Sequence, residues 1–114
     1  NSKSGLHHAG LFFFRKEKVM DSLLQDLKDK LNITWDEEDT ERKLNMIIED
    51  AKLTLNYKLG HSIDYSKEGI EHSLFLNYCM YAYNNCINEF DDNYFNEIMQ
   101  IRQMYEVINY EESK

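Results

Sequence analysis

Residues 43–60 read KLNMIIEDAKLTLNYKLG, and this stretch decides the fold. Its apolar side chains recur at intervals of three and four residues, which is the period of one face of an α-helix. The stretch ends on Gly60, the residue type best suited to the left-handed conformation that closes a helix. We predict a helix that starts near Trp35 and has a core stripe of Leu44, Ile47, Ile48, Ala51, Leu55 and Leu59.

The start of this helix is predicted from Thr34-Trp35-Asp36-Glu37, which matches a capping box. In a capping box the threonine hydroxyl accepts a hydrogen bond from the amide of Glu37, whose carboxylate accepts one from the threonine amide. An earlier helix is predicted from Met20 to Leu31 and ends at Asn32-Ile33. Its single stripe consists of Leu23, Leu24, Leu27 and Leu31.

After the long helix, residues 60–66 are polar and predict a loop that Ile63 and Tyr65 hold to the body. A third helix opens at Ser66 or Gly69 and stops at Asn84-Asn85. Its apolar residues cover more than one side, which is typical of a helix that is central or lies at an interface. One side has Ile70, Leu74, Tyr78, Tyr81, Ala82 and Cys86, and the second has Phe75, Cys79 and Tyr83.

Residues 89–93 are expected to supply a stop and the next N-cap. The fourth predicted helix runs from about Tyr94 to Ile108, and the polar residues from Tyr110 to Lys114 are expected to be frayed. No strand alternation of useful length occurs, and the 114 residues contain no proline. The sequence therefore predicts an all-α fold, a compact bundle of about four helices with short loops. The expected core contains Leu27, Leu44, Ile48, Ala51, Leu55, Leu74, Tyr78, Ala82, Ile98 and Ile101.

Residues 1–19 differ in charge from the rest of the chain. They carry four Lys and Arg against one Glu, whereas residues 20–114 carry a net charge of −11. A signal peptide is rejected because the apolar run is too short and no small-residue cleavage site follows it. Two interpretations stay open: a translated leader upstream of a natural start at Met20, or an arm that packs against a neighbour. Residues 20–114 are expected to form a single helical domain.

Charge and motif spacing exclude several function classes. A net charge of −8 leaves no large basic face for phosphates, which disfavours sequence-specific nucleic-acid binding. No histidine pair has the spacing of a metal site, and no glycine-rich phosphate loop exists. No apolar run approaches the roughly 20 residues of a membrane span. The sequence thus predicts no catalytic residue, no cofactor, no metal and no membrane contact.

The two cysteines and the aromatic residues have alternative interpretations. Cys79 and Cys86 lie seven residues apart, which on one helix is about 10.5 Å of rise and too far for a disulfide, so they indicate buried, reduced thiols in an intracellular protein. Aromatic residues make up 13% of the chain, with eight tyrosines. Buried tyrosine hydroxyls need hydrogen-bond partners, so an excess of tyrosines favours partly solvated positions such as protein interfaces. For Tyr81 and Tyr83, core and subunit interface both stay open.

A set of short motifs between Leu23 and Ile108 resembles the phage head-tail connector (adaptor) family, whose members are also described as phage DNA-packaging proteins. Relatives often carry arginine in the stretch that corresponds to Met80 and Tyr83, and this chain departs from that pattern. The matching elements are Leu31-Asn32-Ile33-Thr34-Trp35-Asp36, Asp39-Thr40, Leu44, Ile47-Ile48-Glu49-Asp50-Ala51, Leu59-Gly60, Tyr78-Cys79-Met80-Tyr81-Ala82-Tyr83-Asn84-Asn85 and Asn88-Glu89-Phe90.

The resemblance implies a non-enzymatic structural protein of a tailed phage or prophage. Such proteins assemble as a ring, dodecameric in the virion, beneath the portal protein after DNA packaging. The ring extends the DNA channel and contacts a stopper or tail-completion protein. The implied location is the virion neck, and the host cytoplasm during assembly. From the charge sign we expect DNA to pass an acidic channel wall without specific binding.

Ring closure needs head-to-tail contacts between two non-identical faces. We expect one face around Tyr81 and Tyr83, and the other on the long helix or near Phe90. The C-terminal segment from Tyr105 is the expected portal-docking element, with Tyr105, Ile108 and Tyr110 as its contact residues. An alternative of another class is a small acidic helical regulator or inhibitor that binds one protein partner.

Overall fold

The computed structural model describes residues 22–113, which form an all-α domain with no strand in that range. The all-α prediction is confirmed, although the described residues contain five α-helices rather than four. The interpretations of residues 1–19 lie outside the described residues. The elements are α2 (Ser22–Lys30), α3 (Glu38–Leu59), α4 (Ile70–Tyr83), the 3-10 helix η1 (Ile87–Glu89), α5 (Phe90–Asn93) and α6 (Phe95–Glu112).

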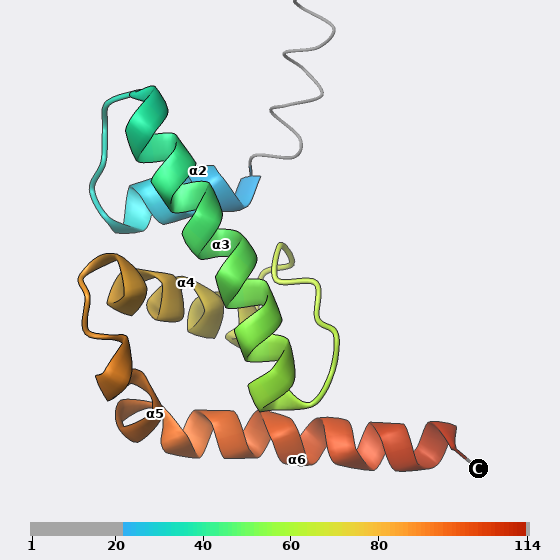
Figure 1. Cartoon of the computed structure of the whole chain (residues 1–114). Coiled ribbons are helices and arrows are strands. Elements are labelled where there is room, and N and C mark those ends of the chain that lie inside the picture. Colours follow the sequence, from blue (N-terminus) through green and yellow to red (C-terminus); the bar gives the residue numbers. More distant parts are fainter. Residues whose placement is uncertain (1–21, 114) are drawn as a thin grey trace, which may run out of the picture.

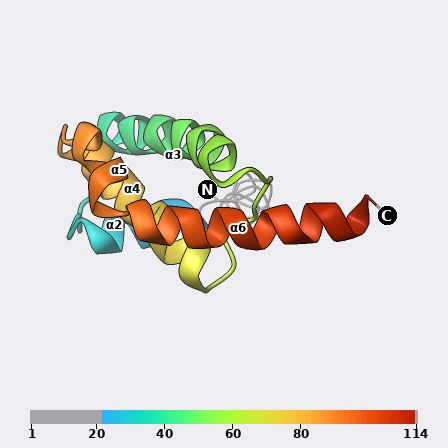
Figure 2. The ribbon, with the colours of Figure 1, turned by 90° about the horizontal axis from the view of Figure 1, so that it is seen from below.

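The helix α3 is the long central element in Figure 1. It packs against α2, α4 and α6, and α2 also contacts α4. The helix α6 crosses below the C-terminal end of α3, and its second half extends away from the other helices (Figures 1 and 2). The domain therefore has a body of crossed helices and one projecting helix end.

The core lies where α2, α3, α4 and α6 meet. All of the ten expected core residues are buried except Ala82, which is half-buried near the C-terminal end of α4. The second apolar side of α4 is also buried, because Phe75 and Cys79 are fully enclosed. A helix apolar on two sides is thus central here, as its pattern predicts.

The predicted capping box is wrong. The helix α3 begins at Glu38, and no side chain caps its first turn. The Thr40 hydroxyl donates a hydrogen bond of 2.7 Å to Glu37 Oε1, in place of the reciprocal Thr34–Glu37 pair. Residues 34–37 therefore belong to the loop that joins α2 to α3.

An ion pair from α2 accounts for this longer loop. Lys28 Nζ donates to Asp36 Oδ1 at 2.6 Å and to Glu41 Oε2 at 3.1 Å. The hydrogen bond between Lys28 and Asp36 raises the pKa of the lysine and lowers that of the aspartate. Ile33 is buried in the same loop. Together these contacts hold the loop against α2 and delay the start of α3.

The other end of α3 matches its prediction. Gly60 has a φ of 75°, and its amide donates to the Asn56 carbonyl at 2.9 Å. In the following loop Ile63 is half-buried and Tyr65 is buried, with the Tyr65 hydroxyl donating to Asn56 Oδ1 at 2.8 Å. Gly69, at a φ of 148°, precedes the first residue of α4. The loop is therefore held to the body as expected.

The C-terminal region differs from its prediction in two places. Residues 89–93 were expected to stop one helix and cap the next, but Phe90–Asn93 form the one-turn helix α5, because the Phe90 ring is buried and the Phe90 carbonyl accepts from the Tyr94 amide at 2.9 Å. The helix α6 continues to Glu112, so the prediction of fraying from Tyr110 is wrong. The Ser113 amide donates a hydrogen bond of 3.1 Å to the Asn109 carbonyl, which closes the last turn of α6.

Candidate interaction surfaces

The described residues contain no arrangement typical of an active site. No group of three or more His, Cys, Asp and Glu residues in residues 22–113 could hold a metal ion. Cys79 and Cys86 are both free, and burial raises the pKa of the Cys79 thiol to about 12, so it stays protonated at neutral pH. The absence of metal, cofactor and catalysis stays a prediction for the whole chain. No helix of the described part is long and apolar enough to cross a membrane.

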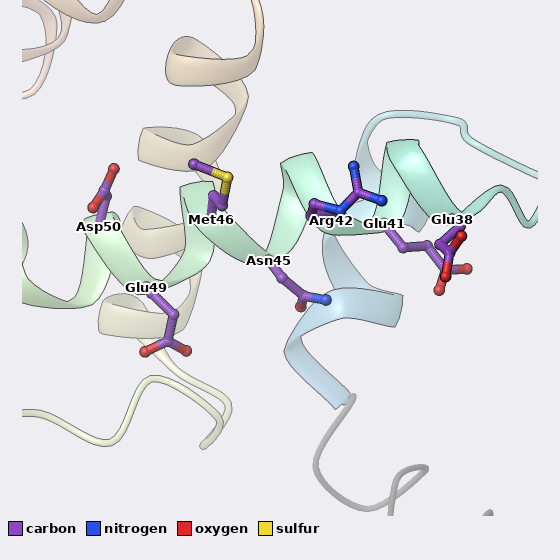
Figure 3. Close-up of a pocket in the computed structure, with 7 residues that line it drawn as sticks. All are labelled: Glu38, Glu41, Arg42, Asn45, Met46, Glu49 and Asp50. Atoms are coloured by element: carbon purple, nitrogen blue, oxygen red, sulfur yellow. The ribbon is translucent and has the colours of Figure 1, made fainter.

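An open groove of about 570 Å³ lies along α3. All of its lining residues come from this one helix, so within the described part of the chain no second wall encloses it (Figure 3). Small-molecule sites are normally concave and largely apolar, whereas four of the seven lining side chains are acidic. The lining residues are Glu38, Glu41, Arg42, Asn45, Met46, Glu49 and Asp50.

The predicted subunit-interface residue Phe90 lies in the core instead. Only 1% of its surface is exposed. Its ring stacks on Tyr94 at a centroid distance of 4.8 Å and meets the edges of Tyr78 and Tyr81 at 4.9 and 5.6 Å. We call Tyr78, Tyr81, Phe90 and Tyr94 the aromatic cluster. Because it attaches α5 and the start of α6 to α4, Phe90 is not available for a subunit contact in this conformation.

Tyr81 and Tyr83 are half-buried, so each contributes to both core and surface. The Tyr81 hydroxyl accepts a hydrogen bond of 3.0 Å from Asn93 Nδ2. The Lys43 ammonium lies 4.9 Å from the centre of the Tyr83 ring, a cation–π contact between α3 and α4. The exposed part of Tyr83 remains accessible to a partner.

The three predicted portal-docking residues divide into one anchor and two surface residues. Tyr105 is half-buried, its hydroxyl donates to Glu71 Oε2, and its ring stacks on His61 at a centroid distance of 4.3 Å. The first residue of the expected docking segment is therefore anchored to the body of the domain. Ile108 and Tyr110, one turn further on, are exposed.

The Tyr105 contact predicts a pH dependence of stability. The Glu71 carboxylate that accepts its hydrogen bond raises the pKa of Tyr105 to about 12, from an ordinary value of 10.0. Because the folded state favours the neutral phenol, its stabilisation is complete below about pH 10 and is lost as the pH rises toward 12. Between pH 9 and 12, urea unfolding should show a steeper loss of stability in the wild type than in Tyr105→Phe. Parallel pH profiles would contradict this assignment.

An exposed apolar strip on α3 was missed in the sequence. Met46, Leu53 and Tyr57 have 64%, 73% and 85% of their surface exposed. The seven- and four-residue intervals between them place all three on one face, opposite the buried face that contains Leu44, Ile48, Ala51 and Leu55. The signal that could have found the strip is this second, outward stripe. We call this side of α3 the outer face of α3. It consists of the strip and the charged residues beside it, which are Arg42, Lys43, Glu49 and Asp50.

Comparisons with known proteins assign no family. No protein-family model, no curated protein and no solved structure gives a significant match to the chain. Function must therefore be inferred from the residues and surfaces described above.

Proposed function

We propose that the chain is a structural protein of a tailed phage or prophage, a head-tail connector that forms a ring beneath the portal. The single observation that carries the proposal is the ordered set of motifs from Leu23 to Ile108 that resembles this family. The structure adds compatible features. The described residues form an all-α domain with an open groove along α3, and apolar side chains are exposed on the outer face of α3 and on the projecting end of α6.

A ring needs two non-identical faces on each subunit. A repeated head-to-tail contact uses one patch of each subunit against a different patch of the next. We assign the first patch to Tyr81 and Tyr83 at the C-terminal end of α4. Of the two expected positions for the second patch, the surroundings of Phe90 lose support because Phe90 is buried, so we assign the outer face of α3.

The projecting end of α6 is the proposed portal-docking element. Ile108 and Tyr110 are exposed there, as are Met104 and Val107. A helix end that exposes apolar side chains can place them as anchors into a groove of a partner protein. The opposite side of the ring would contact the stopper or tail-completion protein.

The acidic surface supports passage of DNA without binding. Residues 22–113 contain 8 Lys and Arg against 19 Asp and Glu, a net charge of −11. A channel lined by such subunits repels phosphates along the whole path. The same charge supports the second candidate function, an acidic helical regulator that occupies a basic site on one protein partner.

A substitution at Tyr83 tests the ring and its proposed face. In Tyr83→Asp the aspartate can still pair with Lys43, whose ammonium lies over the ring in the wild type. We therefore expect unchanged helical content by circular dichroism and no ring on the portal protein encoded by the same genome. Loss of helicity would place Tyr83 in the core, and an unaffected ring would remove it from the interface.

A further inference from the structure

The charges on the outer face of α3 are complementary to themselves. Met46 lies at the centre of the pattern, with Arg42 and Lys43 four and three residues before it and Glu49 and Asp50 three and four residues after it. At 3.6 residues per turn, positions i−4 and i+3 share one flank of a helix, and positions i−3 and i+4 share the other. Each flank of Met46 therefore carries one basic and one acidic side chain.

An antiparallel two-fold arrangement satisfies all of these charges. If two α3 helices pack face to face with Met46 on the axis, each residue before Met46 faces one after it on the second copy. Arg42 then lies opposite Glu49 on one flank, and Lys43 lies opposite Asp50 on the other. Each pair occurs twice, which gives four opposite-charge pairs. A parallel arrangement would place like charges at the same height.

We propose that the outer face of α3 is a self-association surface whose occupant is the α3 helix of a second copy, antiparallel and centred on Met46. The proposal does not rest on the phage assignment. The occupant is a second copy because the helix carries basic residues before Met46 and acidic residues after it. This order of charges is complementary to the same helix running in the opposite direction.

The residues of this surface are accessible. Figure 3 shows Arg42, Met46 and Asp50 projecting on one side of the helix, and both open grooves along α3 include these three residues in their lining. The grooves measure about 570 and 290 Å³ and flank Met46. In Figure 2 the side of α3 turned away from α6 meets no other described helix. The surface therefore has room for side chains of a second helix.

The present ion-pair partners of Arg42 and Glu49 can be exchanged at low cost. Arg42 pairs with Asp39 at 2.9 Å, and these side chains are 63% and 81% exposed. Glu49 pairs with Lys52 at 3.2 Å, again on the surface. Exposed pairs three residues apart contribute little to stability. Ion pairs across a dimer can replace them without destabilising the monomer.

Exposed apolar side chains extend the same contact. Leu53 follows Met46 by seven residues, and Tyr57 follows it by eleven. Leu53 is 73% exposed and Tyr57 is 85% exposed, and both lie on the same face of α3 as Met46. Burial of these side chains against the second copy adds an apolar gain to the charge pairs.

A contact made by one helix per subunit belongs to the low end of interface sizes, below about 1,200 Å², where association is weak. We therefore expect a dimer that forms reversibly with concentration and weakens as salt screens the charge pairs. Such a dimer would cover the outer face of α3 in the free protein, and any other use of that face would require its dissociation.

Sedimentation velocity of the full chain at low salt, over a concentration series, tests the proposal. The wild type should show a reversible monomer–dimer equilibrium. The double variants R42E/K43E and E49K/D50K should each weaken dimerisation by at least about tenfold in Kd, because four attractive pairs become repulsive. The control E111K/E112K changes two exposed glutamates of α6 by the same net charge as E49K/D50K and should leave the equilibrium unchanged. Circular dichroism checks that every variant keeps its helical content.

Mixing the two double variants gives the sharpest result. In the mixed dimer every reversed charge again faces its opposite, so a one-to-one mixture should dimerise like the wild type. The quadruple variant R42E/K43E/E49K/D50K should also recover. A wild type that stays monomeric over the whole series would overturn the proposal. Double variants that still dimerise, or a mixture that fails to recover, would overturn it equally.

Discussion

Phe90→Ala is expected to lower the free energy of unfolding by about 3–5 kcal/mol, the usual cost of removing a fully buried phenylalanine ring. The Phe90 side chain contacts Tyr78, Tyr81 and Tyr94, so the cavity left by its removal would be lined by rigid rings that cannot collapse into it. The substitution should also loosen the attachment of α5 and the start of α6 to α4. Urea denaturation followed by circular dichroism measures the effect.

Phe95→Ala is the matched control for this prediction. Phe95 lies five residues further on, at the start of α6, and is 59% exposed. The same atoms are removed from a surface position, so the change should stay within about 0.5 kcal/mol. If Phe90→Ala and Phe95→Ala behave alike, the aromatic cluster does not form as described, and Phe90 returns as a candidate for the subunit interface.

Ile48→Ala is expected to cost about 2–5 kcal/mol of unfolding free energy. Ile48 is 4% exposed and lies on the buried face of α3, the helix against which α2, α4 and α6 pack. Leu53→Ala is its control on the opposite face of the same helix, where 73% of the side chain is exposed, and should change stability by less than about 0.5 kcal/mol. Equal costs would show that the two faces of α3 are wrongly assigned.

The helices were predictable where one local signal decides their position. The apolar stripe of α3 and the left-handed Gly60 both depend on residues within a few turns, and the structure confirms both. The start of α3 was not predictable in this way. It depends on Lys28, eight residues before Asp36 and on another helix, and a short capping pattern contains no information about such a contact.

The candidate surfaces also divide into those that a local signal could reveal and those that depend on contacts between distant parts of the chain. Phe90 was expected at a subunit interface, and only the surrounding rings of Tyr78 and Tyr94 reveal that it is buried. Tyr105 was expected to contact the portal, yet Glu71 and His61 from distant parts of the chain hold it. The outer face of α3 could have been found from the spacing of Met46, Leu53 and Tyr57, because its signal is local to one helix.

We propose that this chain assembles as a ring on a portal protein. Electron microscopy of the wild-type chain mixed with the portal protein from the same genome tests it most directly. We predict a closed ring of this chain attached to one end of the portal, on its long axis. A portal without added density, together with a chain that remains a symmetric dimer in solution, would contradict the connector proposal and favour the acidic regulator.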